Sequence, residues 1–156
     1  MKHWISAFRL RTLPLALSSI LMGSFLAYYY NSFNGLTTSL CILTTVFLQV
    51  LSNLANDYGD FENGADNDER IGPKRALQSG EISKKQMKNA IYIFVFLSLS
   101  SGISLIYSAF GIQYIYYQLG FLTLGIGAIW AALNYTAGKN PYGYRAMGDI
   151  FVFLFF

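Results

Sequence analysis

The sequence predicts an all-α fold, a multi-spanning bundle of transmembrane helices, on three observations. Hydrophobic residues make up 54% of the 156 residues and charged residues only 12%, whereas soluble chains carry roughly 25% charged residues. Several long segments contain no charged side chain at all. The charges that do occur are confined to a few connections between those segments. The lipid bilayer is therefore the expected solvent for much of the chain.

Four segments are long and apolar enough to cross the hydrocarbon core, which takes about 20 residues. None contains Asp, Glu, Lys or Arg; they are residues 13–30, 36–55, 90–110 and 114–135. A fifth apolar run covers residues 150–156, which is too short to span. We therefore expect residues 1–156 to be the N-terminal half of one truncated helical membrane domain, with four full spans and the start of a fifth.

The connections between the spans differ in charge. All eleven Lys and Arg residues lie before the first span or within residues 56–89 and 136–149, and all eight acidic residues lie in the last two segments. Residues 31–35 and 111–113 carry no charge. The positive-inside rule then assigns the charged connections to the cytoplasm. We expect a multi-pass protein of the cell (inner) membrane, with its N-terminus and any active site facing the cytoplasm.

Several classes of site do not fit the composition. Cys41 and His3 are the only residues of their types, so neither an intrachain disulfide nor a histidine-based metal site or triad is expected. The net charge of +3 comes without a polar run of basic and aromatic residues, so no nucleic-acid partner is expected. A metal ion here would need oxygen ligands.

The start of the third span carries a helix signal. Ser83 and Gln86 have the spacing of a capping box, and Ile82 and Met87 have that of a hydrophobic staple. We therefore expect a helix that begins just after Ser83.

Polar residues follow the second span into its cytoplasmic connection. If that helix continues past Ala55, the spacing places four of them on one face: Gln49, Asn53, Asn56 and Asp60. Polar side chains at membrane depth are costly unless they face a bundle interior or a cavity. The stripe therefore predicts a cavity that opens to the cytoplasm.

The carboxylates at the end of this stripe require neutralisation. Asp57, Asp60 and Asp66 repel one another, and the negative end of the helix dipole disfavours them. Mg²⁺ would resolve both problems, since it takes one or two carboxylates together with water and substrate phosphates. The spacing fits no EF-hand loop. The alternative is a solvated acidic loop, and the polar stripe favours a site instead.

Basic residues share these connections with the acids. Arg70 and Arg75 flank a Gly-Pro turn. Guanidinium groups bind phosphate oxygens as a fork, so a mixture of acids and arginines suits a metal-bound diphosphate. Lys139 lies in the later connection, and Arg11, at the start of the first span, has the reach to contribute.

Four segments in this order resemble the UbiA superfamily of intramembrane prenyltransferases. They are RLRTLPLA (9–16), QVLSNLANDYGDFENGAD (49–66), RIGPKRALQSGEIS (70–83) and NYTAGKNPYGYRAMGDIFVFLFF (134–156). The superfamily pattern N-x-x-x-D-x-x-x-D is met by Asn56 and Asp60, but Gly64 takes the last position and the next acid is Asp66. This G-x-D variant is similar to the branch that acts on 1,4-dihydroxy-2-naphthoate.

The resemblance implies a UbiA-like bundle and a reaction. The cofactor would be Mg²⁺, and the substrates polyprenyl diphosphate and 1,4-dihydroxy-2-naphthoate, with loss of CO₂ and diphosphate to give demethylmenaquinone. It also implies roles for residues. Asn56, Asp60 and Asp66 would be catalytic and would bind Mg²⁺ with diphosphate. The expected substrate-binding residues are Arg75, Arg70, Lys139, Asn53, Asp57, Tyr142, Asp149 and Arg11, of which Tyr142 and Asp149 would lie near the acceptor or order their loop.

The family carries a second Asp-rich motif in a later cytoplasmic loop, which these 156 residues do not include. We therefore expect this chain alone to be inactive. Two alternatives remain open. One is a UbiA-family enzyme for another aromatic acceptor, such as 4-hydroxybenzoate or a chlorin. The other is a membrane transporter with an acidic cytoplasmic vestibule, although polar residues at one face only favour a one-sided site.

Overall fold

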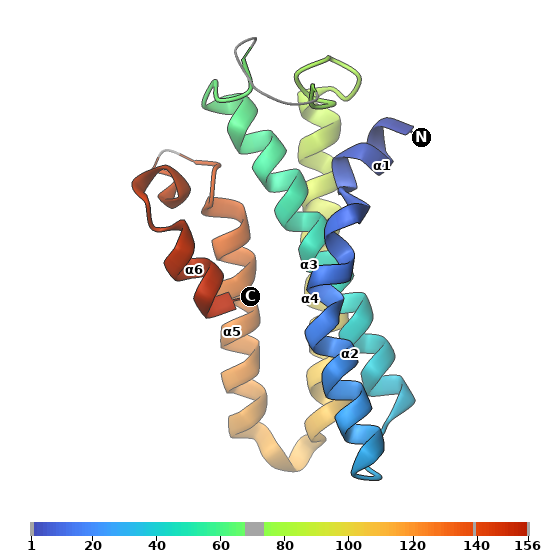
Figure 1. Ribbon diagram of the computed structural model, residues 1–156. Helices are drawn as coiled ribbons and strands as arrows, with labels where there is room; N and C mark the ends of the chain where they lie inside the picture. The colour runs from blue at the N-terminus through green and yellow to red at the C-terminus, as the bar shows by residue number, and fades with distance from the viewer. Residues whose placement is uncertain (1, 68–73, 139, 156) are drawn as a thin grey trace.

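The computed structural model describes residues 2–67, 74–138 and 140–155. Within these ranges every regular element is helical, which confirms the all-α prediction (Figure 1). The long helices are α2 (Leu13–Tyr29), α3 (Gly35–Glu62), α4 (Lys84–Phe110) and α5 (Ile115–Asn134). The shorter elements are α1 (Lys2–Phe8), η1 (Leu10–Thr12), η2 (Ile112–Tyr114), η3 (Tyr142–Arg145) and α6 (Gly148–Phe155).

Four helical stretches in the described residues are long and apolar enough to cross a membrane: Lys2–Tyr29, Gly35–Glu62, Lys84–Phe110 and Ile112–Asn134. They contain the four predicted apolar segments, except for the last residue of the first and of the fourth. Residues 150–155 of the fifth apolar run lie in α6. Large apolar side chains on the outer helix faces are exposed, as expected of surfaces that face lipid.

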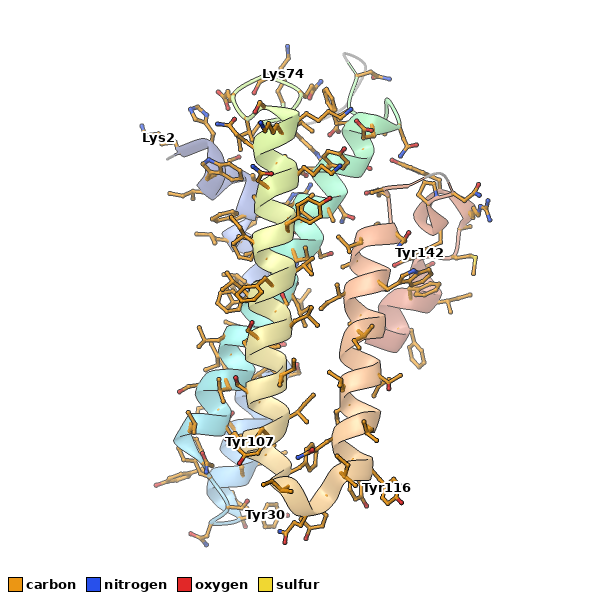
Figure 2. The ribbon with its side chains drawn as sticks, turned by 180° about the vertical axis from the view of Figure 1, so that it is seen from behind. Lys2, Tyr30, Lys74, Tyr107, Tyr116 and Tyr142 are labelled. Carbon is orange, nitrogen blue, oxygen red and sulfur yellow. The ribbon has the colours of Figure 1, made fainter. Side chains whose placement is uncertain are left out.

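The two ends of the bundle differ in chemistry (Figure 2). Lys2 and Lys74 lie at one end, which we call the charged end; it also holds the connection from α3 to α4. Tyr30, Tyr107 and Tyr116 lie at the opposite end, near the two uncharged connections. Tyrosine is enriched where a transmembrane helix leaves the hydrocarbon. The helices therefore alternate in direction as the charge pattern predicted.

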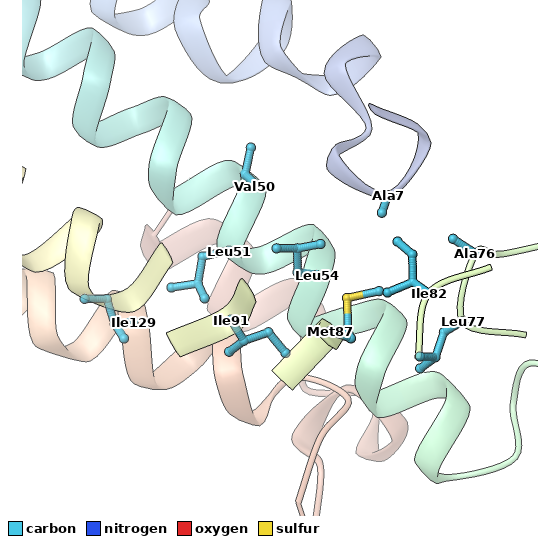
Figure 3. Close-up of a cluster of buried hydrophobic side chains, with 10 residues drawn as sticks. All are labelled: Ala7, Val50, Leu51, Leu54, Ala76, Leu77, Ile82, Met87, Ile91 and Ile129. Carbon is cyan, nitrogen blue, oxygen red and sulfur yellow. The ribbon is translucent and has the colours of Figure 1, made fainter. Parts of the chain in front are cut away.

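Helix α3 is the centre of the bundle, since it packs against α1, α2, α4 and α5. Its buried residues nearest the charged end form the middle of a hydrophobic cluster (Figure 3). The cluster draws on α1, α3, α4, α5 and the connection before α4, and comprises Ala7, Val50, Leu51, Leu54, Ala76, Leu77, Ile82, Met87, Ile91 and Ile129. A solid apolar layer therefore lies directly beneath the loops of the charged end.

The start of α4 has the predicted capping box. The backbone N–H of Gln86 donates to Ser83 Oγ at 3.3 Å, and the backbone N–H of Ser83 donates to Gln86 Oε1 at 2.9 Å. Ile82 and Met87, the predicted staple pair, are both buried in the cluster. Lys84, in the first turn, forms an ion pair with Glu62 at the end of α3. These contacts join the two ends of the connection between α3 and α4.

The cluster predicts an uneven response to one chemical change. Leu54→Ala removes a side chain that is 0% exposed, so it should lower the free energy of unfolding by about 2 kcal/mol or more, because the neighbours cannot fill the cavity. Leu15→Ala makes the same change at an 83% exposed position on α2 and should have little effect. Thermal unfolding in detergent, followed by circular dichroism, measures both; equal losses would contradict the placement of the core.

Candidate functional site

Helix α3 continues past Ala55 to Glu62, so the polar stripe of Gln49, Asn53, Asn56 and Asp60 lies on one helix as predicted. The side-chain amide of Gln49 lies 3.5 Å from Asn53 Oδ1. Asn53 is buried, and its amide nitrogen donates two further hydrogen bonds to the segment that joins α1 and α2.

Asn53 holds the break between α1 and α2. Its Nδ2 donates to the Phe8 carbonyl at 3.0 Å and to Thr12 Oγ1 at 3.3 Å. Arg9 lies at this break with φ of 50°, a left-handed conformation that costs a non-glycine residue roughly 1–2 kcal/mol. The side chain of Arg9 pairs with Asp57, one turn along α3 from Asn53. Two neighbouring polar residues of α3 thus compensate for the break and hold the N-terminal segment.

Asp57 is the centre of an ion cluster. Its side chain is 3% exposed, and its Oδ1 pairs with the guanidinium groups of both Arg9 and Arg75. Arg75 also reaches the other two acids, with Nη1 at 3.2 Å from Asp60 Oδ2 and Nε at 3.4 Å from Asp66 Oδ2. One guanidinium therefore lies among three carboxylates. We call Arg9, Asp57, Asp60, Asp66 and Arg75 the ion cluster; its three acids outnumber its two arginines.

The G-x-D spacing has a structural explanation. Gly64 has φ of 71°, the left-handed conformation that ends many helices and favours glycine. The backbone N–H groups of Ala65 and Asp66 donate back to the Asp60 carbonyl at 2.9 and 3.3 Å. This turn buries Asp66 and brings its carboxylate to Arg75. Asp66 thus shares Arg75 with Asp60 although it does not lie on the helix.

Arg75 is presented by an ordered turn. Its backbone N–H donates to Gln78 Oε1 at 3.3 Å, and its carbonyl accepts from the Ser79 N–H at 2.9 Å. The next two residues, Ala76 and Leu77, are buried in the hydrophobic cluster. Apolar contacts therefore fix the backbone beside α3, while the Arg75 side chain keeps 15% of its surface exposed at the charged end.

The connection after α5 packs against the same part of α3. Thr136 Oγ1 donates to the Asn56 carbonyl at 3.2 Å, and Asn63 Nδ2 donates to the Thr136 carbonyl at 2.7 Å. A Cβ at Gly59 would overlap the backbone of Thr136 and Ala137. Asn56, one of the predicted metal ligands, therefore lies where α3 contacts a connection that is far from it in sequence.

Tyr144 reaches from this connection to the ion cluster. Its hydroxyl donates to Asp60 Oδ1 at 2.7 Å. Partial burial of the hydroxyl, and then this hydrogen bond, raise the pKa of Tyr144 above its ordinary value. The phenol is therefore neutral at physiological pH and acts as a donor. Asp60 thus has a protein donor at each carboxylate oxygen, Tyr144 at Oδ1 and Arg75 at Oδ2.

Tyr142 orders the connection rather than reaching the cluster. Its hydroxyl donates to the Ala131 carbonyl at 2.7 Å, and its ring stacks on Trp130 and Phe151. Burial raises the pKa of Tyr142. Of the two roles expected for this residue, the geometry supports the ordering of the loop. Asp149 is exposed in the first turn of α6, where the helix dipole favours a carboxylate.

The remaining predicted residues are Arg70, Lys139 and Arg11. Arg70 and Lys139 lie outside the described residues. Arg11 is exposed, whereas Arg9, two positions earlier, pairs with Asp57. Neither Arg9 nor Tyr144 was among the residues predicted for the site. Their only signals were the basic residues before the first span and the tyrosines of the later connection. The substrate roles predicted for Asn53, Asp57 and Arg11 stay predictions.

The side chains at the charged end offer the chemistry that Mg²⁺ prefers, namely carboxylate and amide oxygens. Asp60 and Asp66 share a partner, and Asn56 lies one turn before Asp60. Within the described residues, however, no three His, Cys, Asp or Glu side chains are grouped so as to hold a metal ion. The donors thus fit a hard cation in type, while the guanidinium of Arg75 lies among them.

Comparison with known proteins agrees with these motifs. The model of the UbiA prenyltransferase family matches residues 16–156. The 1,4-dihydroxy-2-naphthoate octaprenyltransferase of Haemophilus influenzae is 51% identical over 100% of this chain and 51% of its own length. The protein of that name from Escherichia coli is 44% identical over 98% and 49%. No solved structure matches the chain.

The chain belongs to the UbiA prenyltransferase family, as its four motif segments predicted. Family membership and the four apolar helices together indicate a multi-pass membrane protein. The chain spans about half the length of the relatives it matches.

The ion cluster predicts a large cost for the loss of one charge. Asp57→Asn keeps the shape of the side chain but leaves two guanidinium groups facing a buried neutral amide, so the free energy of unfolding should fall by roughly 3 kcal/mol. Glu62→Gln, also on α3, removes the charge of an exposed side chain whose partner, Lys84, is exposed too. It should change the free energy of unfolding little. Chemical unfolding in detergent compares them; a loss no larger for Asp57→Asn would contradict the burial of the pair.

The contact between α3 and the connection after α5 predicts an effect of one methyl group. Gly59→Ala places a Cβ into the backbone of Thr136 and Ala137, and such overpacking costs about 1–3 kcal/mol. Gly120→Ala, on α5, meets nothing within 4 Å and is the matched control. The temperature of thermal unfolding should fall for Gly59→Ala and not for Gly120→Ala. An unchanged unfolding temperature in Gly59→Ala would show that this contact does not form.

Proposed function

We propose that this chain is part of an enzyme that transfers a polyprenyl group from its diphosphate to 1,4-dihydroxy-2-naphthoate, with loss of CO₂ and diphosphate, in menaquinone biosynthesis. The observation that carries the proposal is the ion cluster, in which the acids of the N-x-x-x-D…G-x-D pattern converge on Arg75. The names of the two relatives support the choice of the naphthoate acceptor. The product would be demethylmenaquinone.

The arginines of the cluster suit the leaving group. Ionisation of an allylic diphosphate places negative charge on the departing diphosphate, and fixed cationic donors lower the cost of that charge. Arg75 and Arg9 are held by Asp57 with their backbones anchored, so they would bind the diphosphate without much loss of freedom. Arg70 and Lys139 are proposed as further diphosphate contacts.

The acids suit a cation that accompanies the diphosphate. Mg²⁺, when bound, would act as a Lewis acid that stabilises charge on the leaving group. Asp60 and Asp66, with Asn56 beside them, are the residues that would hold it. Tyr144 would orient Asp60, because its hydroxyl donates to one oxygen of that carboxylate.

The position of the cluster suits a lipid-like substrate. The cluster lies at the charged end, and the helix faces below it expose apolar side chains. A polyprenyl tail would therefore lie along apolar helix surface while its diphosphate meets the cluster. We propose that the charged end faces the cytoplasm in the cell membrane, since the basic connections gather there.

The acceptor is the finer part of the proposal. Another UbiA-family acceptor, such as 4-hydroxybenzoate, would use the same diphosphate site, so competition between the two acceptors in one assay distinguishes them. For a transporter, polar groups would follow a path through the membrane. The charged side chains within the described ranges instead lie towards the charged end.

The proposed reaction predicts a specific loss. In a full-length protein that carries this chain, Asp60→Asn should lower Mg²⁺-dependent prenyl transfer by about 100-fold or more. The substitution removes one of the carboxylates that would hold the Mg²⁺ bound to the leaving diphosphate. Glu62→Gln, an acid on the same helix outside the cluster, should keep its activity. Radiolabelled polyprenyl diphosphate and 1,4-dihydroxy-2-naphthoate in nanodiscs provide the assay, and full activity in Asp60→Asn would refute the role of Asp60.

A further inference from the structure

Arg75 occupies a central place among groups that would hold a divalent cation. Its Nη1 pairs with Asp57 and lies 3.2 Å from Asp60, and its Nε lies 3.4 Å from Asp66. These acids are buried or largely buried, and buried carboxylates are stable only when paired. In this arrangement the guanidinium therefore supplies positive charge that Mg²⁺ would otherwise supply.

We propose that Arg75 is an exchangeable counter-ion. Without a metal, the Arg75 guanidinium neutralises Asp60 and Asp66. When a metal-bound diphosphate binds, these two carboxylates would bind the metal, and the Arg75 guanidinium would instead donate to phosphate oxygens. The inference deepens the proposed function and rests on it in one respect, that the substrate is a metal-bound diphosphate. It adds that metal and diphosphate bind as a coupled pair.

The surroundings of Arg75 suit such an exchange. The backbone is fixed by Gln78 and by the buried residues that follow, so only the side chain needs to turn. A guanidinium has five N–H donors, and the pairing with Asp57 can be kept while others change partner. Arg9 pairs with the same oxygen of Asp57. This buried carboxylate therefore keeps a cationic partner throughout the exchange.

The exchange has a consequence for binding that a simple phosphate-binding arginine lacks. A metal ion alone must compete with Arg75 for Asp60 and Asp66, and diphosphate alone must draw Arg75 away from them. When both bind, the diphosphate pairs with the Arg75 that the metal displaces, and the metal pairs with the carboxylates that Arg75 leaves. Each ligand therefore favours the binding of the other. Mutual effects of this kind typically change affinity by about 5- to 150-fold.

The test measures metal binding without turnover. Mn²⁺ replaces Mg²⁺ and is followed by electron paramagnetic resonance in the full-length protein in nanodiscs, with and without inorganic diphosphate. Arg75→Gln should bind Mn²⁺ alone at least about 5-fold more tightly than the wild type, while its Mn²⁺ affinity gains little from diphosphate. Lys74→Gln removes the neighbouring positive charge, which lies in no described ion pair, and should match the wild type.

Two outcomes would overturn the exchange. One is an unchanged or weaker affinity of Arg75→Gln for Mn²⁺ alone, as expected if Arg75 binds only phosphate. The other is an equal gain in Lys74→Gln, which would show a general effect of net charge. Arg75→Lys provides a second variant if Arg75→Gln unfolds. It keeps a charge near Asp57 but lacks the fork that reaches both other acids, so it too should bind Mn²⁺ alone more tightly.

The same data separate this inference from the proposed function. Wild-type protein whose Mn²⁺ affinity does not respond to diphosphate would remove the proposed function, and the exchange with it. Wild-type protein that binds the two together, with no gain of Mn²⁺ affinity in Arg75→Gln or Arg75→Lys, would keep the function and remove only the exchange.

Discussion

The charged end of this bundle depends on one buried carboxylate. Asp57 projects from α3 with almost no exposure and pairs with two guanidinium groups that come from different parts of the chain. Breaking a buried pair by the loss of one partner is strongly destabilising. The N-terminal segment, which carries Arg9, and the connection before α4, which carries Arg75, are therefore both bound to the same point on α3.

The remaining contacts arrange the site around that point. Asn53 compensates for the interruption of the helix beside Arg9, and the left-handed Gly64 turns Asp66 back towards Arg75. The connection after α5 approaches closely because Gly59 has no side chain, and it delivers Tyr144 to Asp60. Segments from three parts of the sequence thus meet where the bundle leaves its apolar layer. This convergence is the reason why the metal and the diphosphate are proposed to bind at one place.

Much of the fold could be predicted because a membrane imposes simple rules. Uncharged segments of sufficient length become spanning helices, and Asn56 and Asp60 share a face because the helix continues past Ala55. Arg9 could not be chosen over Arg11, because the left-handed residue at position 9 interrupts the helix. Helical periodicity therefore does not tell in which direction either side chain points. Tyr144 lies in η3, a short 3-10 helix whose position depends on the packing of Tyr142. A local sequence pattern does not encode that packing.

In the proposed function, the carboxylates around Arg75 receive a metal-bound diphosphate. An experimental structure of the full-length protein with Mg²⁺ and inorganic diphosphate tests it most directly. We expect Mg²⁺ on Asp60 and Asp66, with Arg75 contacting a phosphate oxygen and still paired with Asp57. Diphosphate bound elsewhere, with Arg75 remaining among all three carboxylates, would contradict it.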